Sequence, residues 1–128
     1  MAYQYEVGNA ELQAVTPSSS FSLAAGLTTL ATVSSHQGVI NGFTFLNLNS
    51  TPAYVQFFDT QASVTLGLTT PTMVIPLPAN ATAANGSGTN MTFDNGININ
   101  AGIKIAGTTA ATGNTAVTTG ILGTVWYR

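Results

Sequence analysis

Charged residues are scarce in this sequence. Only 6 of its 128 residues are charged, four acidic and two basic, against about a quarter in an ordinary soluble domain. Binding of nucleic acid depends on several cations that neutralise phosphates, so we expect no nucleic-acid partner. Because charge normally keeps protein surfaces apart, this chain must use hydroxyl and amide groups instead or bury surface in an assembly. Its 21 threonines and 11 asparagines supply the polar groups.

Cysteine and long apolar runs are also missing. Without cysteine, a disulfide scaffold and a cysteine-based zinc site are excluded, and a chain of this length buries enough surface to fold without them. No run approaches the ~18 apolar residues of a transmembrane helix, so we expect no membrane partner. The first residues, MAYQYEVGNAEL, lack the basic and apolar regions of a signal peptide, which predicts synthesis in the cytoplasm.

An alternation of apolar and polar residues is the strongest pattern present, and residues 96–107 (GININAGIKIAG) show it best. The odd positions are apolar: Ile97, Ile99, Ala101, Ile103 and Ile105. The even positions hold Asn98, Asn100, Gly102 and Lys104. Successive side chains of a strand point to opposite faces, so the pattern predicts one strand with an apolar and a polar face.

Six other segments have strand-like composition: residues 28–34, 38–49, 53–59, 72–77, 90–94 and 120–128. The short connection predicts that residues 38–49 and 53–59 are neighbouring antiparallel strands. Residues 94–96 (DNG) have the composition of a turn. Pro76 cannot donate to a ladder, so residues 72–77 are expected at a sheet edge.

These segments predict an all-β fold. We expect an antiparallel β-sandwich, jelly-roll-like, with about seven or eight strands in a single domain at residues 21–128. Residues 1–20 are expected to form an extended N-terminal arm. The layer that covers the isoleucines is expected to come from Phe43, Phe45, Val55, Phe57 and Val125.

Residues with catalytic chemistry are few. A Ser-His-Asp triad would need His36, the one histidine, but no serine lies in a GxSxG elbow. Asp59 and Asp94 are the only carboxylates outside the arm, and such a pair can hydrolyse glycosides or, with asparagine carbonyls, bind calcium. All three residues adjoin turn residues, where a structural role is favoured. We predict no enzyme, no catalytic residue, no cofactor and no metal site.

Binding surfaces are the remaining candidates. Tyr54, Trp126 and Tyr127 fit a sugar-stacking surface, but burial of their rings in the core or at a subunit interface is favoured. The polar face of residues 96–107 carries one charge, too little to repel neighbours. The residues predicted to meet other subunits are Tyr3, Tyr5, Glu6, Asn98, Asn100, Lys104 and Arg128.

From Phe43 onward, about two-thirds of the chain resembles a group of small phage and prophage β-sandwich structural proteins. The matching segments are residues 49–59 (NSTPAYVQFFD), 70–78 (TPTMVIPLP), Phe93 before Gly96 and Ile97, 105–108 (IAGT) and 123–127 (GTVWY). Members often carry an aspartate-rich stretch after the IxGT element. Residues 110–114 (AATGN) contain no aspartate here, which leaves any role of those acids in doubt.

This resemblance implies a virion component, most simply a capsid cement or decoration protein. Such a protein binds the major capsid protein, stabilises the head and is commonly a homotrimer. The alternative is a tail-fibre, baseplate or head-surface module that recognises host glycans. Its support is the loops rich in asparagine, threonine and glycine with tyrosines nearby.

Overall fold

The computed structural model describes residues 19–23, 26–80 and 87–128, and this part of the chain consists of strands and loops without a helix. Eight strands follow in the order β1 (Ser19–Ser22), β2 (Leu30–Ser34), β3 (Gly38–Asn47), β4 (Ala53–Asp59), β5 (Met73–Leu77), β6 (Ser87–Ile99), β7 (Ile103–Thr108) and β8 (Leu122–Tyr127). The all-β prediction is confirmed.

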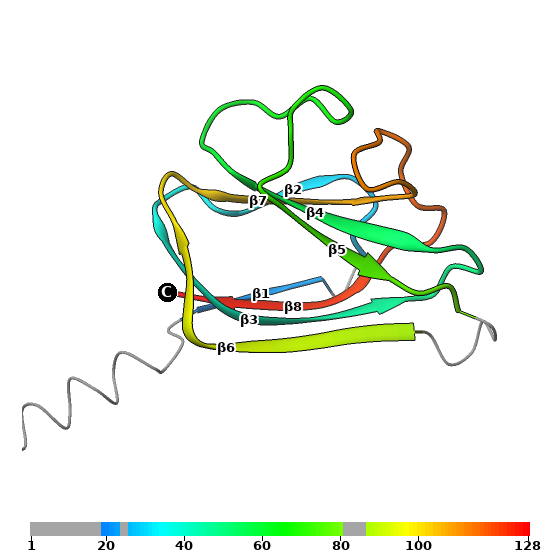
Figure 1. Cartoon of the computed structure of the whole chain (residues 1–128), viewed down its shortest axis with the longest axis horizontal. Coiled ribbons are helices and arrows are strands. Elements are labelled where there is room, and N and C mark those ends of the chain that lie inside the picture. The colour runs from blue at the N-terminus through cyan, green and yellow to red at the C-terminus, as the bar shows by residue number, and fades with distance from the viewer. Residues whose placement is uncertain (1–18, 24–25, 81–86) are drawn as a thin grey trace, which may run out of the picture.

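The strands form two four-stranded antiparallel sheets that pack face to face (Figure 1). One sheet has the order β1-β8-β3-β6 and the other has the order β2-β7-β4-β5. The pairs β1·β8, β2·β7, β3·β6 and β4·β5 are nested about the middle of the chain. Such nesting is what a long antiparallel hairpin produces when it wraps around a core, and it is the topology of a jelly roll.

The core lies between the sheets and contains the predicted residues. Phe43 and Phe45 stack with ring centroids 4.8 Å apart. Phe57 of the opposite sheet lies 5.8 Å from the first ring and 6.0 Å from the second. Aromatic pairs at these separations add to the free energy of area burial. The same cluster contains the remaining expected residues: Val55, Ile99, Ile103, Ile105 and Val125.

Residues 96–107 are not one strand, and this prediction is wrong. β6 ends at Ile99 and β7 begins at Ile103, and the two belong to opposite sheets. At the corner, a Cβ atom on Gly102 would lie 3.0 Å from the Ser34 carbonyl oxygen and 3.1 Å from that of Thr60. Ile99 and Ile103, which lie on either side of this corner, both face the core, so the alternation of apolar and polar residues continues through it. Alternation therefore does not reveal that the backbone changes sheets.

The DNG sequence at residues 94–96 is a bend inside β6 rather than a turn between strands. Opposite β3, the pairing moves from Ile40↔Ile97 to Gly42↔Thr92, so β6 has extra residues at this point. Gly96 has a φ of +76°, a conformation in which a side chain is strained. A glycine and a bulge re-aim a strand without ending it.

β3 and β4 are not neighbours in a sheet, contrary to the prediction from their short connection. They lie in opposite sheets, and residues 48–52 cross from one to the other. β5 is an edge strand, as Pro76 predicts. β1 had no sequence signal, yet its four residues pair with β8 from Ser19↔Tyr127 to Ser22↔Thr124.

A buried asparagine network fixes the crossing between β3 and β4. The Asn47 Nδ2 atom donates to the carbonyl oxygens of Thr51 and Pro78, at 3.0 and 2.9 Å. Its Oδ1 atom accepts from the backbone N–H and the Nδ2 of Asn49, at 2.9 and 2.8 Å. Asn49 in turn exchanges hydrogen bonds with the backbone of Thr119. The end of β3, the end of β5 and the connection to β8 are thus held together by side chains.

Candidate functional site

The outer face of the β2-β7-β4-β5 sheet is covered by loops. The connections at residues 60–72 and 109–121 both rise from this side of the sandwich (Figure 1). Gln56 and Phe58 point outward from β4, yet they are 0% and 2% exposed. The Gln56 Nε2 atom donates to the carbonyl oxygens of Ala110 and Gly113, which holds the second loop on the sheet. The chain's own loops therefore cover the centre of this face.

The outer face of the β1-β8-β3-β6 sheet has no such cover. No described segment lies over it in Figure 1. The strand register places three rows of side chains on this surface, which we call the open face. The rows are Ser20, Trp126, Gly42 and Thr92; then Ser22, Thr124, Thr44 and Asn90; then Leu122, Leu46 and Gly88.

Trp126 is the largest side chain of the open face. It belongs to neither the buried core nor the residues packed against it. Its Cε3 atom lies 3.6 Å from the position that a Cβ atom on Gly42 would occupy, so the ring reaches over this glycine. Burial of Trp126 in the core is thus excluded, whereas its role at an interface stays a prediction. A tryptophan ring on a sheet surface offers a large apolar area to a partner.

The polar side chains of the open face are neutral and have no hydrogen-bond partners among the described residues. None of its residues is charged. Within the described residues, the side chains of Ser20, Thr44, Asn90, Thr92 and Thr124 make no hydrogen bond to protein. On the covered sheet, by contrast, Gln56 and Thr108 bind each other at 2.8 Å. The open face thus combines apolar area with donors and acceptors that face solvent.

The interface residues predicted from the polar face of residues 96–107 do not share a face. Asn98 is the last residue but one of β6 and Asn100 lies in the corner before β7, both exposed. Lys104 lies on the other sheet, where its Nζ atom donates to the carbonyl oxygens of Gln61 and Ala62. Arg128 pairs its backbone with that of Val39. The prediction of one shared polar face is wrong because the corner between β6 and β7 places its members on different sheets. The other predicted interface residues, Tyr3, Tyr5 and Glu6, lie outside the described residues.

Asn98 and Asn100 do share a shallow hollow at one end of the sandwich. Its lining comes from the β2–β3 connection and the end of β6: Gln37, Gly38, Val39, Asn98, Ile99 and Asn100. The hollow contains no charged side chain. It adjoins the C-terminal end of the chain, since the Val39 backbone N–H donates to the Arg128 carbonyl oxygen at 2.8 Å.

Asp59 has a structural role that matches its prediction. Its carboxylate accepts the backbone N–H groups of Asn100 and Ala101, both at 2.8 Å, and that of Gly102 at 3.3 Å. Burial by itself raises the pKa of Asp59, but these three hydrogen bonds outweigh burial and hold the pKa below its ordinary value of 3.8. The carboxylate thereby satisfies the backbone N–H groups of the corner between β6 and β7.

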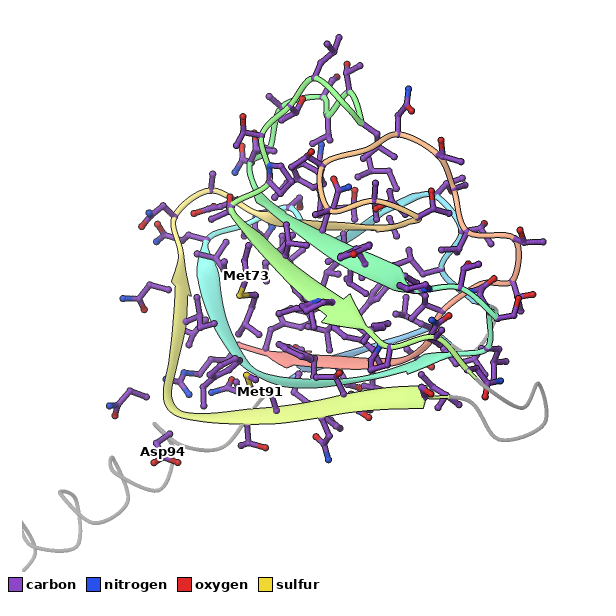
Figure 2. The ribbon with its side chains drawn as sticks, turned by 45° about the vertical axis from the view of Figure 1, so that its right-hand side comes forward. Met73, Met91 and Asp94 are labelled. Atoms are coloured by element: carbon purple, nitrogen blue, oxygen red, sulfur yellow. The ribbon has the colours of Figure 1, made fainter. Side chains whose placement is uncertain are left out.

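This arrangement predicts an acid-sensitive contribution to stability. The pKa of Asp59 is lower in the folded protein than in the unfolded chain. The contribution of Asp59 to folding stability is therefore complete above pH 3.8 and is lost as the pH falls through the folded pKa. We expect Asp59→Asn to lower the urea midpoint at pH 7 and to flatten the loss of stability between pH 5 and pH 2. Asp94→Asn is the matched control, since Asp94 is exposed at the bend of β6 (Figure 2) and should change neither quantity. Equal midpoints for wild type and Asp59→Asn at pH 7 would contradict the assignment.

The other chemical candidates have no site around them. His36 is exposed in the turn between β2 and β3, where its backbone N–H donates to the Ser34 Oγ atom at 3.2 Å. Among the described residues, no three histidine or acidic side chains gather where they could hold a metal ion. That part of the chain also contains no helix long and apolar enough to cross a membrane.

The alternation of residues 120–128 is enough to place Leu122, Thr124 and Trp126 on one face of the last strand, but it does not reveal the open face. The missing signal was the register, which aligns them with Thr44 and Leu46 of β3 and with β1 and β6. Comparisons of the chain with protein-family models, with curated proteins and with solved structures gave no match. The proposed function therefore rests on the residues and on this geometry.

Proposed function

We propose that the protein is a non-enzymatic virion structural protein of a phage, a capsid decoration protein that docks through its open face on the major capsid protein. The observation that carries the proposal is the asymmetry of the sandwich. The centre of one sheet is covered by the chain's own loops, whereas the other presents a broad uncharged surface with Trp126 on it. A jelly roll is also a recurrent architecture of capsid proteins, which supports the proposal by analogy of fold.

The chemistry of the open face suits a protein partner. Removal of neutral hydroxyl and amide groups from water costs less free energy than removal of charges, and partner groups restore their hydrogen bonds. Tryptophan is among the residues that most often dominate the binding energy of an interface. Half-buried Leu46 and Leu122 extend the apolar area in the next row. The resemblance implies a homo-oligomer on the capsid and favours a trimer, whereas the edge of this sheet points to a pair of copies.

Substitution of Trp126 tests this docking. We expect Trp126→Asp to lower the affinity for capsids at least about 100-fold, since it removes a central aromatic and adds a charge that docking would desolvate. The measurement is co-sedimentation of purified protein with undecorated capsids, with circular dichroism to establish that the variant is folded. Leu68→Ala is the control, because Leu68 is 83% exposed in the loop over the covered sheet.

The number of copies in the particle decides the same question independently. A decoration protein occurs hundreds of times in a virion, so quantitative mass spectrometry of purified particles should find it at that level. A few copies per particle, or unchanged capsid binding by Trp126→Asp, would contradict the proposal.

Glycan recognition is the second candidate, and the open face favours it as well. An aromatic ring flanked by neutral hydroxyl and amide groups is suited to stack on a sugar and to bind its hydroxyls. Trp126 is the only tryptophan of the chain, so its fluorescence reports directly on this surface. A saturable change on titration with neutral oligosaccharides, abolished in Asn90→Ala, would favour the glycan module over capsid docking.

A further inference from the structure

β6 is the longest edge strand among the described strands of the sandwich. It has 13 residues and lies at the end of the β1-β8-β3-β6 order, and no other described strand pairs with its outer side. The other three edges are less accessible to pairing, since β1 and β2 have four and five residues and β5 contains Pro76. A free edge presents unpaired backbone N–H and C=O groups, which bind another extended chain.

The first half of β6, before the bulge and the bend at residues 94–96, does little to prevent such pairing. Natural edge strands are commonly protected by charges, prolines or bulges. Residues 87–93 (SGTNMTF) contain no charge and no proline, and six of them, Ser87 to Thr92, pair with β3 without a break in register. The first charge is Asp94, at the bend, where its side chain points away from the sandwich (Figure 2).

An exposed apolar side chain marks the same edge. Met91 lies opposite Phe43 and therefore on the inner face of the sheet, yet it is 42% exposed because no described strand lies beyond β6. Met73 begins β5, the edge of the opposite sheet, and packs partly buried on the core. The two methionines point toward each other across the opening between the sheets (Figure 2). Methionine adapts its shape to a partner surface.

We infer that β6 of one copy pairs antiparallel with β6 of a second copy. A two-fold axis perpendicular to the sheet joins β1-β8-β3-β6 of both copies into one eight-stranded sheet and leaves neither copy with this free edge. The neutral side chains of residues 87–93 are compatible with their own copies, and the axis brings Met91 of each copy to the same seam. Met91 is thereby removed from water.

The second copy is favoured over a foreign strand by its continuity with the open face. Pairing about this axis keeps both open faces on the same side, so the dimer presents one continuous surface of twice the area. In this respect the inference rests on the proposed docking function. It differs from the trimer that the resemblance implies, because two-fold edge pairing closes with two copies.

Single cysteines test the pairing cleanly, since the chain has none of its own. We expect Asn90→Cys and Thr92→Cys to give dimers with a short bis-maleimide cross-linker, because both residues lie on β6. Ser20→Cys is the control on the opposite edge of the same sheet and should stay monomeric under the same conditions. Cross-linking through Ser20→Cys but not through β6 would overturn the inference.

Mass in solution gives the second readout. Light scattering of the full chain should find twice the monomer mass of 13.1 kDa at about 100 μM. Met91→Lys should restore the monomer, since it places two like charges at the seam, whereas neutral Met91→Gln should remain dimeric. A monomer or a three-fold mass for the wild type would overturn edge pairing. Capsid co-sedimentation of Trp126→Asp is scored separately, so failure of the dimer is distinguishable from failure of the docking function.

Discussion

Replacement of Ile103 with aspartate is expected to leave no folded protein. Ile103 begins β7, is 1% exposed and lies in the core between the sheets. A carboxylate at this position would be buried among apolar side chains without a partner. The expected loss exceeds about 5 kcal/mol, which is comparable with the whole free energy of unfolding of a small domain. The measurement is the far-ultraviolet circular dichroism and the urea transition of the purified variant.

Ile103→Val is the matched control for this substitution. It removes one methylene group and keeps the β-branched shape, so we expect a loss of about 1 kcal/mol with an intact cooperative transition. If Ile103→Asp unfolds at the same urea concentration as Ile103→Val, the residue does not lie in the core.

Substitution of Asn47 should have the second-largest effect. Asn47 is fully buried, and its amide makes four hydrogen bonds, two to carbonyl oxygens and two to Asn49. Asn47→Ala would leave the Thr51 and Pro78 carbonyl oxygens and the Asn49 backbone N–H without these partners. Each buried group that loses its partner costs about 1–3 kcal/mol, so we expect a loss of about 3–5 kcal/mol in urea unfolding.

Two variants test whether the amide itself is required. Asn47→Asp keeps an acceptor for Asn49 but sets a carboxylate oxygen against two carbonyl oxygens, so it should be at least as destabilising at pH 7 as Asn47→Ala. Asn90→Ala is the control on the open face, where the asparagine side chain makes no hydrogen bond to described residues. It should change stability by less than about 0.5 kcal/mol. A similar loss for Asn47→Ala and Asn90→Ala would contradict the role of the network.

The outward polar side chains of the two sheets differ in their hydrogen-bond partners, and the proposed function is based on this difference. On the β2-β7-β4-β5 sheet, polar side chains such as Gln56 and Lys104 bind the chain's own loops. On the β1-β8-β3-β6 sheet, the equivalent polar side chains have no partner among described residues. The open face of this sheet thus offers hydroxyl and amide groups, and no charge, to solvent.

Composition and periodicity determined the fold class of this protein. Period-two alternation identifies strands because it follows from backbone geometry, and apolar residues at alternate positions must be buried somewhere. The core aromatic residues were predictable for the same reason, whereas the edge position of β5 was predictable because Pro76 cannot donate to a ladder. The turn role of Asp59 was predictable as well, but its partners at residues 100–102 lie some 40 positions away in the sequence.

Only the tertiary structure decided which strands share a sheet. Residues 96–107 read as one strand, yet they cross between the sheets, because a corner at Gly102 preserves the alternation. The short connection after β3 joins opposite sheets. Its backbone groups, such as the Thr51 carbonyl oxygen and the Asn49 N–H, are hydrogen-bonded to the Asn47 side chain rather than paired in a hairpin. The open face likewise depends on the register of four strands from distant parts of the chain. Local sequence specifies a residue's side of its strand, whereas long-range pairing specifies what lies beside it.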